Sequence, residues 1–207
     1  MKVVALLVVD PEGPDPRAST LGAPLLRHAA LGLLEAADRL VVAVTQPLLG
    51  DCESIIEAVP GAGSRCRVLV CGPGRDLREA VDATGPADVV LVHDLARPFA
   101  PPATARAVAE AVFAGAEAIV PVLPVTDTVK LVDGGVIRAT SDRNRLRVAQ
   151  TPVGYRPGVL AELVADGADP LSDLPGTVRT VAGHPTALRL TTAFDVTVAE
   201  ALLEEQG

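Results

Sequence analysis

Short apolar runs alternate with helical segments through residues 1–125, and this alternation limits the possible folds more than any other feature. The apolar runs span residues 3–9, 39–45, 66–72, 88–94 and 117–125, and the helical segments span residues 25–37, 51–59, 75–84 and 102–115. Parallel strands need crossover helices, and strands covered on both faces are apolar along their whole length. The pattern therefore predicts an α/β fold, a Rossmann-like and mostly parallel sheet with helices on both faces.

This alternation stops at Thr126. Residues 130–140 are predicted to form a β-hairpin, because Asp133 and two glycines supply a turn between two alternating runs. A polar stretch with several arginines follows, then a helix at 157–167, the unassigned segments 177–183 and 187–192, and a closing helix at 193–206. We expect one domain over residues 1–207, with the hairpin forming a protruding arm at about 126–150.

Composition excludes several classes of partner. The net charge is -8 and aromatic residues make up 2% of the chain, which argues against a nucleic-acid surface. The three cysteines have no metal-ligand spacing and are too few for a disulfide framework, so we expect a reducing, cytoplasmic location. The apolar run at 3–9 is too short to cross a membrane. Small anionic ligands remain possible, because a local arginine cluster can bind them.

The run "VVLVHDLARPF", residues 89–99, reads as a buried strand that is followed directly by charged side chains. Desolvating unpaired charges is costly, and ligands of open parallel sheets bind beyond the carboxyl ends of the strands. Asp94 and Arg97 are therefore expected to face a ligand crevice. The alternative is an internal ion pair between them that seals the strand end. His93 is expected to be a structural residue.

Four segments resemble, in order, the motifs of the 2-C-methyl-D-erythritol 4-phosphate cytidylyltransferase family. They read "VHDLARPF", "PVLPVTDTVK", "SDRNRLRVAQTP" and "LRLTTAFDVTVAEALL" and lie between residues 89 and 203. The resemblance implies a nucleotide-diphospho-sugar transferase type of fold. It also implies that CMP is transferred from CTP to a sugar-alcohol phosphate with release of pyrophosphate, a step of isoprenoid precursor synthesis.

The resemblance also implies roles for individual residues. Asp94 would hold Mg²⁺, the nucleotide and the substrate, Gly72 would bind the nucleotide, and Arg189 would be a catalytic cation that faces the phosphates. Arg97 and Thr151 would contact the substrate. Thr128 and Arg143, on the arm, would reach the substrate phosphate of a partner subunit, so a homodimer is implied.

The loop "DPEGPDPRASTLGAP", residues 10–24, departs from the family pattern. The family has a Gly-rich loop and a Pro-Lys pair that surround the triphosphate, whereas this loop has prolines, which lack N–H donors, and several carboxylates. Arg17 is the loop's only cation and is the candidate for the missing catalytic charge. Arg78 stands where the family has a serine that contacts cytosine.

These departures leave three interpretations open. The chain is an active cytidylyltransferase, a transferase that uses another nucleotide, or a catalytically silent homologue that binds a sugar phosphate or a partner protein. An open pocket beside residues 10–20, with backbone amides pointing into it, would favour an enzyme, and a filled one would favour a silent homologue.

Overall fold

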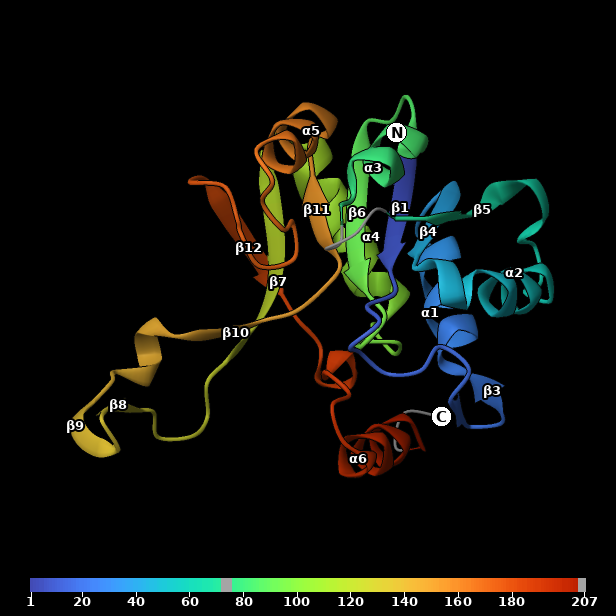
Figure 1. Cartoon of the computed structure of the whole chain (residues 1–207). Coiled ribbons are helices and arrows are strands. Elements are labelled where there is room, and N and C mark those ends of the chain that lie inside the picture. The colour runs from blue at the N-terminus through green and yellow to red at the C-terminus, as the bar shows by residue number, and fades with distance from the viewer. Residues whose placement is uncertain (72–75, 205–207) are drawn as a thin grey trace.

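One central sheet organises the protein, and the computed structural model describes residues 1–71 and 76–204. The sheet order is β10-β7-β11-β6-β1-β4-β5, and β12 also pairs with β7 (Figure 1). Its strands are β1 (Val3–Val8), β4 (Arg39–Val44), β5 (Cys66–Val70), β6 (Val89–Asp94), β7 (Ala118–Pro124), β10 (Arg147–Ala149), β11 (Val153–Tyr155) and β12 (Val178–Ala182). The five strands expected from the apolar runs are confirmed.

The sheet is mostly parallel, as predicted. Strand β1 pairs in parallel with β4 and β6, and β4 pairs in parallel with β5. Strand β11 lies between β6 and β7 and is antiparallel to both. Strands β10 and β11 follow each other along one edge of β7, and β12 pairs with its other edge. The sequence patterns did not predict β10 or β11.

Helices cover both faces of the sheet, which confirms the predicted α/β architecture. One apolar core joins the sheet to α1 (Leu25–Leu34), α2 (Leu49–Glu57), α4 (Pro102–Phe113) and α6 (Ala193–Glu204). The opposite core joins it to α3 (Arg78–Thr84) and α5 (Pro157–Ala165). Alternate residues of β1, such as Leu6 and Leu7, enter opposite cores, as the two-residue period of a strand requires.

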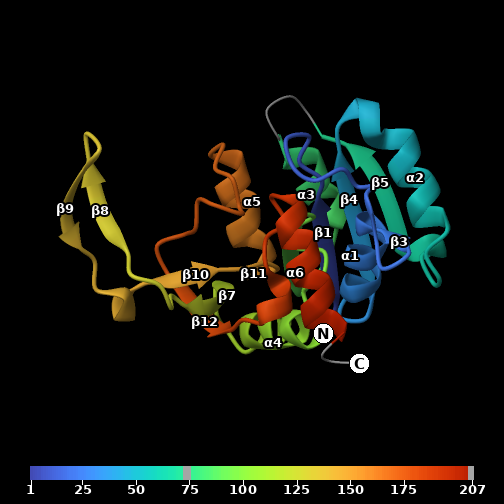
Figure 2. The same ribbon diagram turned by 90° about the horizontal axis from the view of Figure 1, so that it is seen from below.

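The predicted hairpin is also confirmed. Strands β8 (Lys130–Asp133) and β9 (Val136–Thr140) pair in antiparallel fashion, and every residue of both is exposed. Figures 1 and 2 show this hairpin extending well away from the central sheet. We call residues 126–150, which include it, the arm.

Shorter elements complete the described residues. They are the hairpin of β2 (Ser19–Thr20) and β3 (Ala23–Pro24) and the 3-10 helices η1 (Gln46–Leu48), η2 (Gly63–Arg65), η3 (Arg143–Arg145) and η4 (Pro185–Ala187). Within residues 1–71 and 76–204, each helix is too short or too polar to span a bilayer.

Candidate active site

Strand β6 delivers its last two side chains, His93 and Asp94, into a buried polar network. Their residues are 1% and 5% exposed. The Asp94 Oδ1 atom accepts a hydrogen bond from the Ala96 N–H at 2.9 Å, and the Asp94 N–H donates to Thr151 Oγ1 at 3.3 Å. A carboxylate this deep needs such donors, because burying an unsatisfied charge is costly.

His93 is a structural residue, as expected. Its Nε2 atom lies 3.1 Å from the Arg97 carbonyl oxygen, which can only accept, so Nε2 carries the proton. Its Nδ1 atom lies 2.8 Å from Thr151 Oγ1 and accepts from that hydroxyl. Burial lowers the pKa of His93 to about 4, so the ring is neutral at pH 7. Neutral His93 therefore fixes Thr151, and Thr151 in turn holds the backbone of Asp94.

The charge of Asp94 is met by Arg189. The Arg189 Nη1 atom lies 2.9 Å from Asp94 Oδ2, and the Arg189 side chain is 49% exposed, whereas that of Asp94 is 8% exposed. A buried carboxylate thus holds one end of a cation that remains accessible to solvent. This pair joins Asp94, expected to hold Mg²⁺ and the nucleotide, to Arg189, expected to face the phosphates.

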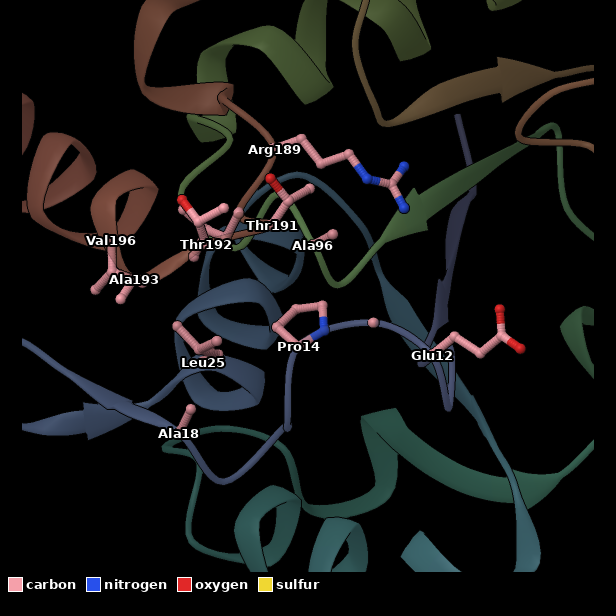
Figure 3. Close-up of a pocket in the computed structure, with 12 residues that line it drawn as sticks. Glu12, Pro14, Ala18, Leu25, Ala96, Arg189, Thr191, Thr192, Ala193 and Val196 are labelled. Atoms are coloured by element: carbon pink, nitrogen blue, oxygen red, sulfur yellow. The ribbon is translucent and has the colours of Figure 1, made fainter.

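A cavity of about 320 Å³ opens beside this ion pair. Figure 3 shows Arg189 on one side of it and Glu12 and Pro14, from the 10–24 loop, on the other. Leu25 and Ala96 also line it, as do residues 190–193 and Val196. The cavity is open, which is one part of the arrangement expected of an enzyme, whereas the N–H groups of Glu12, Gly13 and Arg17 are bonded to Asp10 and Asp15 within the loop.

The cavity wall formed by residues 191–196 is fixed by Asp195. Its carboxylate accepts hydrogen bonds from the N–H and hydroxyl groups of both Thr191 and Thr192, at 2.7 to 3.0 Å. These donors, with the Thr191 N–H the largest contribution, lower the pKa of Asp195 to about 2. Thr192 Oγ1 in turn accepts from the Asp195 N–H at 3.3 Å, so the start of α6 is closed by a reciprocal capping box.

A second cavity, of about 250 Å³, also includes Arg189. Its other lining residues are Val8, Asp10, Asp94, Asp169, Leu171 and Ser172. Arg189 thus borders both cavities, and Asp94 borders the second. A guanidinium with five donors can contact oxygens of two different ligands from such a position.

Arg97 does not form the ion pair with Asp94 that the alternative interpretation required. Its Nη1 atom donates to the Ala187 carbonyl oxygen at 2.6 Å, and its Nη2 atom donates to the Ala149 carbonyl oxygen at 3.0 Å. Burial lowers the pKa of Arg97. The idea of a sealed strand end is therefore wrong, since Asp94 pairs with Arg189 and borders a cavity.

Arg17 lies apart from this cluster. Its side chain is exposed and pairs with Asp15 at 2.8 Å and with Asp51, in α2, at 3.0 Å. The hydrogen bonds that the Arg17 guanidinium donates to Asp15 hold the pKa of Arg17 above its ordinary value. Arg17 is not among the described residues that line the two cavities. In this conformation the loop's cation is held by carboxylates of its own chain.

Among the predicted site residues that the structure describes, Asp94 and Arg189 line these cavities, whereas Arg97, Thr151, Thr128 and Arg143 do not. Thr128 and Arg143 are exposed on the arm, and the Arg143 Nη1 atom donates to the Thr126 carbonyl oxygen at 2.5 Å. Gly72 lies outside the described residues. The structure thus brings Asp94, Arg97, Thr151 and Arg189 together, and it places the arm residues elsewhere.

The comparisons with known proteins agree with the motifs. Residues 14–205 match the family model described as 2-C-methyl-D-erythritol 4-phosphate cytidylyltransferase. A curated protein of that name from Saccharopolyspora erythraea is 39% identical over 98% of this chain and 100% of its own length. The chain belongs to the 2-C-methyl-D-erythritol 4-phosphate cytidylyltransferase family. A cytidylyltransferase of the same name from Rhodococcus jostii is 39% identical over 89% of this chain and 84% of its own length.

Solved structures show the same cytidylyltransferase fold. The crystal structure of 2-C-methyl-D-erythritol 4-phosphate cytidylyltransferase from Thermus thermophilus matches with a TM-score of 0.75 and 30% identity, covering 99% of this chain and 100% of that one. The resemblance inferred from residues 89–203 is therefore confirmed for nearly the whole chain. The family model begins at residue 14, inside the 10–24 loop whose sequence departs from the family pattern.

Gln150 and the second cavity were not predicted from the sequence. Gln150 is 2% exposed and lies between Ala149, which contacts Arg97, and Thr151, which contacts Asp94. A single glutamine in a polar stretch gives no signal of burial. The sequence around Asp169 and Ser172 also gave no signal of a site, because these residues reach the second cavity only through the tertiary fold.

Proposed function

We propose that this protein transfers CMP from CTP to 2-C-methyl-D-erythritol 4-phosphate and releases pyrophosphate, as a step of isoprenoid precursor synthesis. The proposal is supported by membership of the cytidylyltransferase family at 39% identity over nearly the full chain. It rests most directly on Arg189, which is held by Asp94 and borders both cavities. No observation on residues 1–71 and 76–204 favours a silent homologue.

The reaction joins two polyanions. An oxygen of the acceptor's phosphate monoester attacks the α-phosphorus of CTP, a new P–O bond forms, and the bond to the β-phosphate oxygen breaks. The attacking oxygen is already anionic, so no general base is needed. The main obstacles are electrostatic repulsion and alignment, which preorganised cations overcome. Arg189 is positioned to supply such a cation between the two substrates.

The donor set fits Mg²⁺ bound jointly with the nucleotide. Mg²⁺ in nucleotide sites is held by one or two carboxylates together with substrate phosphates and water. Asp94 borders a cavity with a carboxylate oxygen that has further lone pairs, although the described residues contain no cluster of three metal-ligating side chains. Asp94 would therefore hold the ion, which when bound supplies charge that the acidic 10–24 loop lacks.

We further propose one catalytic domain that works as a cytoplasmic homodimer through the arm. Thr128 and Arg143 are exposed and outside both cavities of their own chain. The arm also exposes apolar side chains that a partner would cover: Leu131, Val132, Val136, Ile137 and Val148. A second subunit's arm would add Thr128 and Arg143 to the site that Asp94 and Arg189 begin.

Pyrophosphate release tests the proposed function. Purified protein is incubated with CTP, 2-C-methyl-D-erythritol 4-phosphate and millimolar Mg²⁺, with Asp94→Asn as the inactive control. Release that requires both substrates and the metal supports the proposal. Release equal to that of a no-enzyme control rejects it, and faster release with another nucleoside triphosphate would reassign the nucleotide.

A further inference from the structure

The segment that carries Arg189 has few backbone bonds of its own to the sheet. Residues 183–190 follow β12 in the chain, and their only regular element is the short 3-10 helix η4. The Gly183 N–H donates to the Val122 carbonyl oxygen, and the Leu190 N–H donates to the Ala96 carbonyl oxygen. Between these two points the segment is held by the Thr186 hydroxyl, which donates to the Phe99 carbonyl oxygen at 3.0 Å, and by side chains from elsewhere in the fold.

Gln150 supplies most of those side-chain bonds. Its Nε2 atom donates to the carbonyl oxygens of His184, at 2.9 Å, and Ala187, at 3.2 Å. Its Oε1 atom accepts from the His184 N–H at 2.8 Å. Both amide hydrogens and the amide oxygen are therefore used, in a residue that is 2% exposed. Only an amide fits, because a carboxylate would face two carbonyl oxygens, and an apolar side chain would leave the part-buried N–H and carbonyl groups of His184 without these bonds and the Ala187 carbonyl oxygen with Arg97 alone.

The fit between Gln150 and this segment is also steric. A Cβ atom at Gly183 would overlap Gln150 Oε1 and would lie 3.1 Å from its Cδ atom. Gly183 therefore leaves the space that the glutamine amide occupies. Because the same amide is bonded to His184, moving it would move the start of the segment.

Gln150 lies where three parts of the site meet. Ala149 before it accepts from Arg97, and Thr151 after it accepts from the Asp94 N–H. The arm ends at Gln150, whose N–H donates to the Pro121 carbonyl oxygen on β7. Three consecutive residues thus touch Arg97, the Arg189 segment and Asp94.

We infer that Gln150 is a positioning residue that holds the 183–190 segment so that Arg189 meets Asp94 and the substrate phosphates. It acts through Arg189 and touches no substrate itself. This inference deepens the proposed function, on which its kinetic part rests. It also makes the root of the arm part of the support of the active site.

Two variants test the inference. Gln150→Met keeps the length of the side chain and removes its three hydrogen bonds. Gly183→Ala adds a Cβ atom that would displace the Gln150 amide. Gln46→Met, at an exposed glutamine in η1, is the matched control. Hydrogen exchange, followed by mass spectrometry on the full chain, should become about tenfold faster in residues 183–190 of both variants and stay unchanged in β1 and β4.

Kinetics then separate positioning from general destabilisation. With radiolabelled CTP, Gln150→Met should lower kcat/KM about tenfold in the wild-type background and less than about twofold in an Arg189→Ala background. Equal losses in both backgrounds, no loss at all, or unchanged exchange in residues 183–190 would overturn the inference. If the wild type or Arg189→Ala shows no turnover, hydrogen exchange alone decides whether Gln150 holds the segment, and a wild type without turnover rejects the proposed function separately.

Discussion

The Arg189 Nη1 atom lies 2.9 Å from the Asp94 Oδ2 atom, and this ion pair joins the end of β6 to the segment that leads into α6. Asp94 is buried and bonded to the backbone of its own turn, whereas Arg189 is half-exposed between two cavities. The pair therefore works as a fixed anchor with an accessible cation.

Removing that cation should affect turnover more than folding. We expect Arg189→Ala to lower kcat/KM for pyrophosphate release about a hundred- to a thousandfold, because one preorganised charge at the transferring phosphate is lost. Arg189→Lys should remain within about tenfold of the wild type, since a point charge stays in place. A similar loss in both variants would show that charge alone is not what the site needs.

Freeing Arg17 should help nucleotide binding if this residue serves the triphosphate. Its guanidinium is held by Asp15 and Asp51. Asp51→Asn removes one of these partners, and we expect KM for CTP to fall by no more than about fivefold, because exposed ion pairs are weak. Asp88→Asn is the control, because Asp88 is an exposed carboxylate that lies far along the chain and pairs with the N-terminal amino group. An increase in KM with Asp51→Asn would argue that Asp51 positions Arg17 usefully.

Two variants with strongly reduced turnover should restore activity when mixed if the arm completes a partner's site. Arg143→Ala lacks the arm cation, and Arg189→Ala lacks the central one. Mixed dimers would contain one intact site each, so an equimolar mixture should recover about a quarter of wild-type activity when subunits exchange freely. Light scattering measures the oligomeric state in parallel. No recovery from exchanging dimers would place all these residues in one subunit's site.

Acid should destabilise the fold through His93. The pKa of His93 is about 4 in the folded protein and near 6.5 in an unfolded chain. Protonation therefore favours unfolding, so the stability from neutral His93 is complete above pH 6.5 and is lost as the pH falls toward 4. Between pH 6.5 and pH 4, the free energy of unfolding in urea should fall by up to about 3 kcal/mol more for the wild type than for His93→Gln. Parallel curves for the two proteins would contradict this assignment.

Packing between β11 and α4 gives a test of the fold itself. A Cβ atom at Gly154 would lie 2.5 Å from Val108 Cγ1 and 2.9 Å from Val112 Cγ2. Gly154→Ala should lower the free energy of unfolding by about 1–3 kcal/mol, because the core would be overpacked. Gly158→Ala, at an open position in α5, should be neutral or slightly stabilising. Equal urea midpoints for both variants would contradict the close approach of β11 to α4.

The parts of the fold with regular periodicity were predictable, and so was Asp94. A run of buried apolar residues that ends in a carboxylate is a local pattern, and β6 shows it directly. Strand β11 was not predictable because three residues carry no period, and it forms only by fitting between β6 and β7. Arg189 was found through the family resemblance alone, since its own segment has no regular structure. The ion pairs of Arg17 depend on where α2 lies, which no local pattern encodes.

The wall of the larger cavity has a consequence for synthesis on the ribosome. Glu12 and Pro14 emerge early, whereas Arg189 and Val196 are among the last described residues to be translated. A nascent chain can pair β1 with β6 long before it has either Arg189 or the start of α6. The larger cavity is therefore completed late, on a sheet whose strands precede it in the chain, and a chain interrupted before Arg189 lacks the wall that residues 189–196 supply.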